Sequence, residues 1–101
     1  MFVHAVYFWL KPGTSAAARE RLVDDCQQYL ARVPNVRHLW VGKPAMTPRS
    51  VVDNTYDVGL LVVLDDAAAH DAYQIHPLHL DFVARNGPVF GRIQIYDFQS
   101  A

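Results

Sequence analysis

The sequence predicts a single α+β domain over residues 1–101, with a ferredoxin-like βαββαβ order and a four-stranded antiparallel sheet. Three observations predict this fold. Four segments are rich in the β-branched and aromatic residues that strands favour. Two intervening regions have the apolar spacing or composition of helices, and the chain has the length of one domain.

The strand segments are bounded by turn residues or by helical regions. The predicted strands are residues 2–10, 36–41, 55–64 and 93–98. Between the second and third strands, residues 42–54 contain two prolines and little apolar periodicity, so we expect a loop there.

The first helical region follows a predicted cap at Thr14 or Ser15 and ends before Pro34. Its apolar stripe consists of Leu22, Cys26, Tyr29, Leu30 and Val33. Asp65 or Asp66 offers a cap for a second helix over residues 67–75. Pro77 interrupts that helix and suits the first position of another helical piece that reaches about residue 86.

Both faces of the first predicted strand are apolar, which points to a dimer. One face carries Phe2, His4, Val6, Phe8 and Leu10, and the other carries Val3, Ala5, Tyr7 and Trp9. Two helices cover only one face of such a sheet, and an exposed second face would form a large apolar patch. We therefore expect a homodimer with sheet packed on sheet. The alternative is that the loop of residues 42–54 folds over the open face.

Charge and cysteine content exclude several classes of function. Nine basic and ten acidic residues give a net charge of −1 without a basic stripe, so no nucleic-acid partner is expected. The single cysteine, Cys26, permits no intramolecular disulfide and no thiolate zinc site, which suits a reducing compartment. Neither a signal peptide nor a membrane span of about 20 apolar residues is recognisable, so a cytoplasmic location is expected.

The candidate site consists of Tyr73, His76, His79, His4 and Asp97. In the predicted order the first strand is antiparallel to the last, so His4 and Asp97 lie at the same end of the sheet. The third strand ends there too, which brings the other three side chains near. A histidine held by a carboxylate is a ready general base, and a tyrosine hydroxyl stabilises a developing enolate. Such a set suits proton abstraction α to a carbonyl.

Each of these residues also has a structural interpretation. His4 is alternatively a hydrogen-bonded core residue, Tyr73 a core aromatic and Asp97 a solvated strand end. His76 precedes Pro77 and alternatively caps or turns the chain. The remaining histidines, His38 and His70, are expected at the surface.

Metal and cofactor sites are not expected. His76 and His79 are three residues apart and His4 adds a third nitrogen, but the proline between the first two leaves their relative direction open. Cys26 falls on the apolar stripe, where a thiol is buried and inert. No phosphate-binding or dinucleotide glycine motif occurs.

Four segments together resemble the stress-responsive A/B barrel (Dabb) family: VHAVYFWLK, VPNVRHLWVGK, YQIHPLHLDF and IYDFQ. The resemblance covers essentially the whole chain. It implies a ferredoxin-like monomer whose sheet packs against a partner's sheet to form a dimeric α/β barrel. The family's name reflects induction under stress in plants.

One branch of the family contains plant polyketide cyclases, which close a ring by aldol condensation without a cofactor. Their catalytic tyrosine and histidine match Tyr73 and His79, and the residues that match His4 and Asp97 line the same site. Related dimeric barrels include cofactor-free monooxygenases. Two hypotheses therefore stay open: an enzyme acting on a small apolar carbonyl or phenolic compound, with His79 as base, or a non-catalytic protein that binds a ligand in this pocket or serves in stress.

Overall fold

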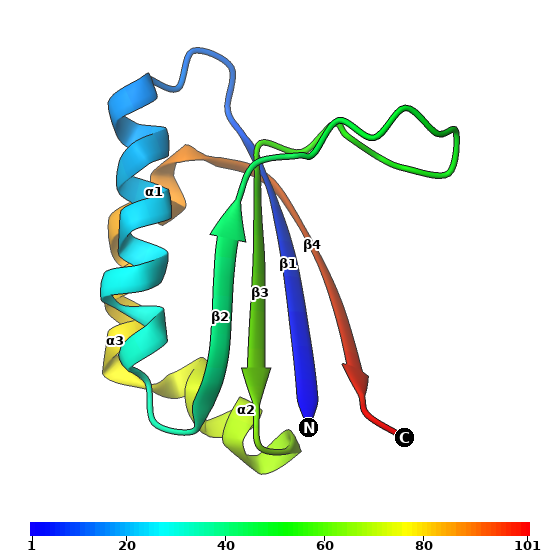
Figure 1. Ribbon diagram of the computed structural model, residues 1–101. Coiled ribbons are helices and arrows are strands. Elements are labelled where there is room, and N and C mark those ends of the chain that lie inside the picture. The colour runs from blue at the N-terminus through cyan, green and yellow to red at the C-terminus, as the bar shows by residue number, and fades with distance from the viewer.

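A computed structural model describes residues 1–101 and confirms the predicted fold class (Figure 1). Its elements are β1 (Phe2–Leu10), α1 (Ala16–Gln28), β2 (Val36–Gly42), β3 (Val58–Leu64), α2 (Ala67–Ile75), α3 (Pro77–Asn86) and β4 (Phe90–Gln99). The strands form one sheet in the order β2-β3-β1-β4, and every neighbouring pair is antiparallel.

Local side chains explain where the helices begin. Ser15 caps α1 by accepting a hydrogen bond of 3.1 Å from the backbone of Ala18. Asp66 caps α2 in the same way through Ala69, at 2.8 Å. Pro77 occupies the first turn of α3, where its missing N–H costs nothing.

Three boundaries differ from the prediction by more than one residue. Helix α1 ends at Gln28, and a 3₁₀ turn over Leu30–Arg32 continues the apolar stripe. Strand β3 begins at Val58 rather than residue 55, and the residue before it, Asp57, donates from its backbone to Phe8 and accepts from the Leu10 backbone through its side chain. Strand β4 begins at Phe90, where pairing with β1 continues past a bulge.

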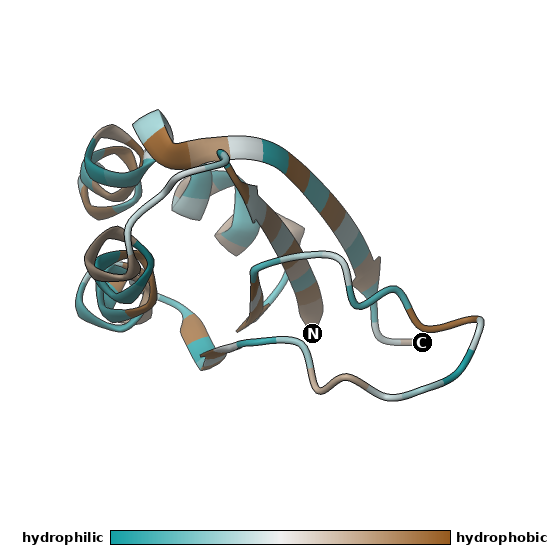
Figure 2. Cartoon of the chain, turned by 90° about the horizontal axis from the view of Figure 1, so that it is seen from above, coloured by the Kyte–Doolittle hydropathy of each residue, from teal (hydrophilic) through white to brown (hydrophobic).

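One face of the sheet, here called the helix-covered face, packs against α1 and α3 (Figures 1 and 2). Alternate residues of β1 and β3 point into this layer and form its core with the apolar stripes of the helices. The buried members include Phe2, Val6, Phe8, Leu22, Cys26, Leu30, Val58, Leu60, Val62, Leu64 and Phe82. Burial raises the pKa of the Cys26 thiol to about 12, with Asp25 adding to the effect, so the predicted inert thiol agrees with its surroundings.

A half-buried ion pair joins α1 and α3. Arg85 of α3 donates from Nε and Nη2 to the carboxylate of Asp25 in α1, at 2.8 and 3.3 Å. Asn86 adds a third hydrogen bond of 2.9 Å to the same carboxylate. Burial alone raises the pKa of Asp25, but the bonds from Arg85 and Asn86 outweigh it and the pKa is lowered. Folding therefore favours the ionised form of the Asp25 carboxylate.

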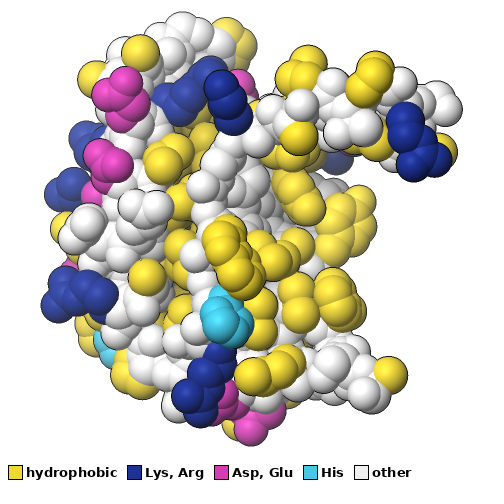
Figure 3. Space-filling view, viewed as in Figure 1, with side chains coloured by type: hydrophobic (Ala, Val, Ile, Leu, Met, Phe, Trp, Pro, Cys, Tyr) yellow, Lys and Arg dark blue, Asp and Glu magenta, His cyan; other side chains and the backbone are white.

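The opposite face of the sheet, here called the open face, has no helix over it (Figure 2). Its large side chains include Trp40, Tyr96 and Phe98, which are 59%, 61% and 59% exposed. The segment of residues 43–57 leaves one end of the sheet and projects away from it on the side opposite the helices (Figures 1 and 3). Its last part packs on that end of the open face, where Tyr56 contacts Tyr7. Trp40, Tyr96 and Phe98 stay exposed, so the loop does not cover the face as the alternative to a dimer required. None of the helices has the length and apolar character needed to cross a bilayer.

Candidate functional site

Strand register brings His4 and Asp97 together. The two residues are direct partners across β1 and β4, and both point to the helix-covered face. Nδ1 of His4 lies 2.6 Å from Oδ1 of Asp97. His4 is buried, whereas the Asp97 side chain retains 35% of its exposure. A carboxylate only accepts, so His4 carries the proton on Nδ1 and donates it to Asp97.

The break between α2 and α3 places Tyr73 and His79 beside this pair. Tyr73, near the end of α2, is 1% exposed and meets the ring of His79 edge-on, with centroids 4.9 Å apart. On its other side the ring of His4 lies 5.9 Å away, also edge-on. Three elements thus contribute one contiguous row of rings, in the order His4, Tyr73 and His79.

These three rings border an apolar cavity of about 130 Å³. Its other lining residues are Val6, Phe8, Leu30, Leu60, Gln74, Phe82, Val83, Phe90, Ile93 and Ile95. Val83 of α3 and Ile93 and Ile95 of β4 are 43–44% exposed, so the cavity opens between α3 and β4.

The protonation states suit a base and a hydrogen-bond donor. Burial lowers the pKa of His79, and His4 lowers it further, against a smaller opposing effect of the Gln74 backbone. Nδ1 of His79 is buried and no hydrogen bond of standard geometry reaches it, although the Gln74 backbone lies close enough to raise the pKa of the ring slightly. Burial raises the pKa of Tyr73, so its hydroxyl stays protonated. Neutral pH therefore gives a neutral imidazole beside a phenol that donates.

His4 is also held neutral. Burial lowers its pKa by more than the hydrogen bond and charge of Asp97 raise it. A histidine whose pKa is lowered on folding binds fewer protons in the folded state than in the unfolded chain.

We therefore expect the free energy of unfolding to fall as the pH decreases from about 7 to 5. His4 and His79 stabilise the fold fully above the unfolded histidine pKa of about 6.5, and this stability is lost as the pH falls toward their lower folded values. Each contributes a slope of at most about 1.4 kcal/mol per pH unit. Urea unfolding at several pH values measures it. His79→Gln should flatten the dependence, whereas His38→Gln, at an exposed position, should not. Constant stability over this range would contradict the expectation.

His76 lies outside the cavity lining. Its Nδ1 accepts a hydrogen bond of 3.1 Å from the backbone of Leu78 and so caps α3. His76 was predicted to line the pocket, with a helix cap as the alternative. The structure has the cap, because the turn before Pro77 directs the ring to the start of α3.

The expectation that His70 lies at the surface was wrong. Its ring stacks on Phe2 with centroids 4.4 Å apart, and its centroid lies 4.9 Å from that of His4. Nε2 of His70 is 4.0 Å from Oδ2 of Asp97. A signal was present in the sequence, because His70 precedes Tyr73 by three residues and therefore shares its helix face. His38, in contrast, is exposed beside Trp40 as expected.

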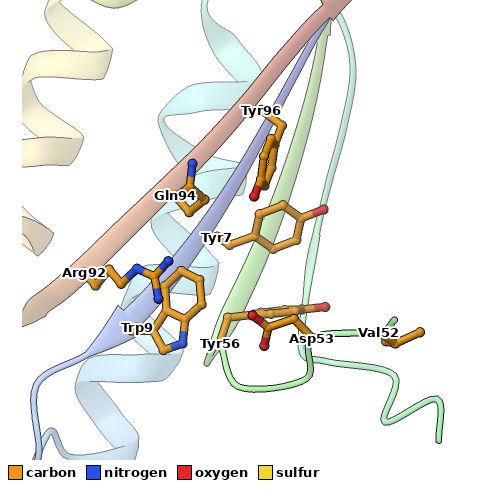
Figure 4. A pocket seen from close by; sticks show the side chains of 8 residues that line it. All are labelled: Tyr7, Trp9, Val52, Asp53, Tyr56, Arg92, Gln94 and Tyr96. Atoms are coloured by element: carbon orange, nitrogen blue, oxygen red, sulfur yellow. The ribbon is translucent and has the colours of Figure 1, made fainter. Parts of the chain in front are cut away.

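A second, more polar cleft of about 320 Å³ lies on the open face, beside the end of the loop that leads into β3 (Figure 4). It is lined by Tyr7, Trp9, Val52, Asp53, Tyr56, Arg92, Gln94 and Tyr96. The Arg92 guanidinium lies 4.2 Å from the centroid of a Trp9 ring, a cation–π contact. Trp9 also donates to Thr55 at 3.0 Å. This cleft faces away from the histidines and is separated from them by the sheet.

Solved structures with the same fold come from several organisms. A Dabb family protein from Mesorhizobium loti with a ferredoxin-like fold is 26% identical, with 99% of this chain and 96% of that chain covered and a TM-score of 0.80. A dimeric ferredoxin-like protein of unknown function from Thermobifida fusca is 20% identical, with 96% and 88% covered and a TM-score of 0.81. Hydroxynitrile lyase from Passiflora edulis is 15% identical, with 96% and 90% covered and a TM-score of 0.79.

No protein with a curated description matches the chain. The stress responsive A/B barrel domain, however, matches residues 2–100, which is nearly the full sequence. The chain therefore belongs to the stress-responsive A/B barrel (Dabb) domain family.

Proposed function

We propose that the cavity takes a small, mainly apolar carbonyl or phenolic compound, on which His79 acts as general base while Tyr73 orients a carbonyl. The carrying observation is that the rings of His79 and Tyr73 meet edge-on, 4.9 Å apart, and both line an otherwise apolar cavity. The match of both residues to the catalytic pair of the polyketide cyclase branch supports the same roles.

In the proposed reaction, neutral His79 removes a proton from the carbon α to the carbonyl. Charge then develops on the carbonyl oxygen, and the Tyr73 hydroxyl donates to it. The enolate carbon attacks a second carbonyl of the same molecule, which forms the new C–C bond and an alkoxide. His79 returns its proton to that alkoxide, so the enzyme ends in its starting state. His4 and Asp97 act as positioning residues, because they support the ring of Tyr73 from behind.

Deuterium exchange tests the first step without knowledge of the natural substrate. A small alkyl methyl ketone such as 2-heptanone, incubated in D2O with the protein, should lose its α-protons faster than in buffer alone, as followed by NMR. Native mass spectrometry of the same sample reports whether the ketone binds. Binding without accelerated exchange would favour the non-catalytic ligand-binding alternative and count against the general base.

We also propose that two chains form a homodimer through the open face. The exposed Trp40, Tyr96 and Phe98 support it, since a monomer rarely leaves an apolar surface that spans the whole sheet in water. The dimeric Thermobifida fusca protein has the same fold. A cytoplasmic location and a role in stress stay predictions.

A charge on the open face should separate the protomers. We expect Phe98→Asp and Trp40→Asp to halve the molar mass measured by light scattering, because a buried unpaired carboxylate opposes sheet packing. The matched control is Ile75→Asp on α2, which is 75% exposed on the helical side and should leave the mass unchanged. A monomeric wild type, or dimeric open-face variants, would contradict the proposed interface.

A further inference from the structure

His70 adds a third group to the His4–Asp97 pair that the proposed reaction does not use. His4 Nδ1, His70 Nε2 and the Asp97 carboxylate all lie within 4.8 Å of one another. They come from β1, α2 and β4, so the fold itself holds them together. His4 is buried and the His70 side chain is 15% exposed, whereas the Asp97 side chain retains 35% of its exposure and opens the cluster to solvent on one side.

The surroundings of His70 indicate which of its nitrogens carries a lone pair. The side-chain nitrogen of Gln74 lies 3.0 Å from Nε2, and an amide N–H₂ can only donate there. A donor at Nε2 leaves the proton of the neutral ring on Nδ1, which lies 3.6 Å from the exposed carboxylate of Asp71. The unprotonated Nε2 thus accepts from Gln74 beside the cluster, and a metal bound at Nε2 would take the place of that hydrogen bond.

A gap separates the ring of His70 from the carboxylate of Asp97. Nε2 of His70 and Oδ2 of Asp97 are 4.0 Å apart, too far for a hydrogen bond. Both atoms carry lone pairs, and neither offers the other a proton. A cation about 2.0–2.2 Å from each fits between them.

We propose that His4, His70 and Asp97 bind one divalent transition-metal ion. Two imidazole nitrogens and one carboxylate suit zinc and its neighbours in the first transition row, whereas magnesium and calcium prefer oxygen ligands alone. On binding, the proton of His4 moves from Nδ1 to Nε2, and the freed Nδ1 lone pair replaces its hydrogen bond to Asp97 with a bond to the metal. The ring stays neutral, and the two histidine nitrogens draw together slightly.

This set differs from the one that the spacing of His76 and His79 suggested. His76 caps α3, and His79 faces the cavity from the far side of Tyr73. The metal site therefore lies beside the proposed base without including it, and the two proposals can fail separately.

Isothermal titration of the tag-free protein with Zn²⁺ at pH 7.5 tests the site. We expect one ion per chain, and about 10- to 100-fold weaker binding for His70→Leu, which keeps an apolar contact with Phe2. Asp97→Asn, which keeps the shape of the side chain, should weaken binding similarly. His38→Leu at an exposed position and His79→Gln in the cavity should bind as the wild type does. Far-UV circular dichroism and thermal melting check that each variant is folded.

Cobalt(II) gives an independent readout, since its visible absorption reports nitrogen and oxygen ligation directly. Strong d–d bands in the wild type that disappear in His70→Leu would support the site. A wild type that binds Zn²⁺ no better than His70→Leu would overturn the proposal and leave a hydrogen-bonded cluster only.

Discussion

His79→Gln is expected to slow the exchange of ketone α-protons by about 10²- to 10⁴-fold, the usual contribution of a positioned general base. Glutamine has a similar reach and polarity but does not accept a proton near neutral pH. The half-buried position beside Tyr73 should accommodate it, so the fold should persist. NMR rates at pH 7 with equal protein concentrations measure the effect.

The matched control is His76→Asn, three residues earlier in the same segment. Asparagine is a good helix cap, so this variant should keep the start of α3 while removing an imidazole. Its exchange rate should equal that of the wild type. An unchanged rate in His79→Gln, or an equal loss in both variants, would show that His79 is not the base.

Asp25→Ala is expected to lower the free energy of unfolding by about 3 kcal/mol, because it removes the acceptor of three hydrogen bonds between α1 and α3. The loss leaves the buried amide of Asn86 with one acceptor, the Phe82 carbonyl. Arg85 is 45% exposed and regains water, which keeps the cost from being larger. Urea unfolding near neutral pH measures the difference.

Asp24→Ala is the control for helix propensity and charge, since Asp24 is the exposed neighbour of Asp25 on α1. Its effect should stay within about 0.5 kcal/mol. The lowered pKa of Asp25 also fixes the sign of its acid response. Its contribution is present above the unfolded carboxyl pKa of about 3.9 and is lost as the pH falls toward the folded value. Equal losses in the two variants would contradict a specific role of the ion pair.

The fold was predictable because its signals are local or periodic. Residues 67–75 and the piece that begins at Pro77 carry their own cap and proline, and the structure has helices over Ala67–Ile75 and Pro77–Asn86. The ends of strands were harder to predict, because they depend on contacts with neighbouring strands that are distant in the sequence. Asp57 bonds to β1 just before β3 begins, and β4 begins beside a bulge in its pairing with β1.

The candidate site was predictable where topology alone brings residues together. Antiparallel pairing of the first and last strands suffices to place His4 opposite Asp97. Side-chain direction was not predictable from spacing, because the turn at Pro77 sends His79 to the cavity and His76 to the helix start. The position of His70 was also missed, since it depends on how α2 packs over the end of β1. The roles of Tyr73, His79, His4 and Asp97 stay predictions until variants are assayed.

Side chains along β1 point alternately to the two faces of the sheet. Those at even positions, such as His4 and Val6, point toward the helices and the cavity, and those at odd positions, such as Tyr7, lie on the open face. Substitutions at neighbouring positions should therefore report on different properties, ligand handling at one and assembly at the next. A single-residue deletion within this strand would exchange the two sets at once. Assembly and chemistry can thus vary independently by substitution, but not by a change in the length of this strand.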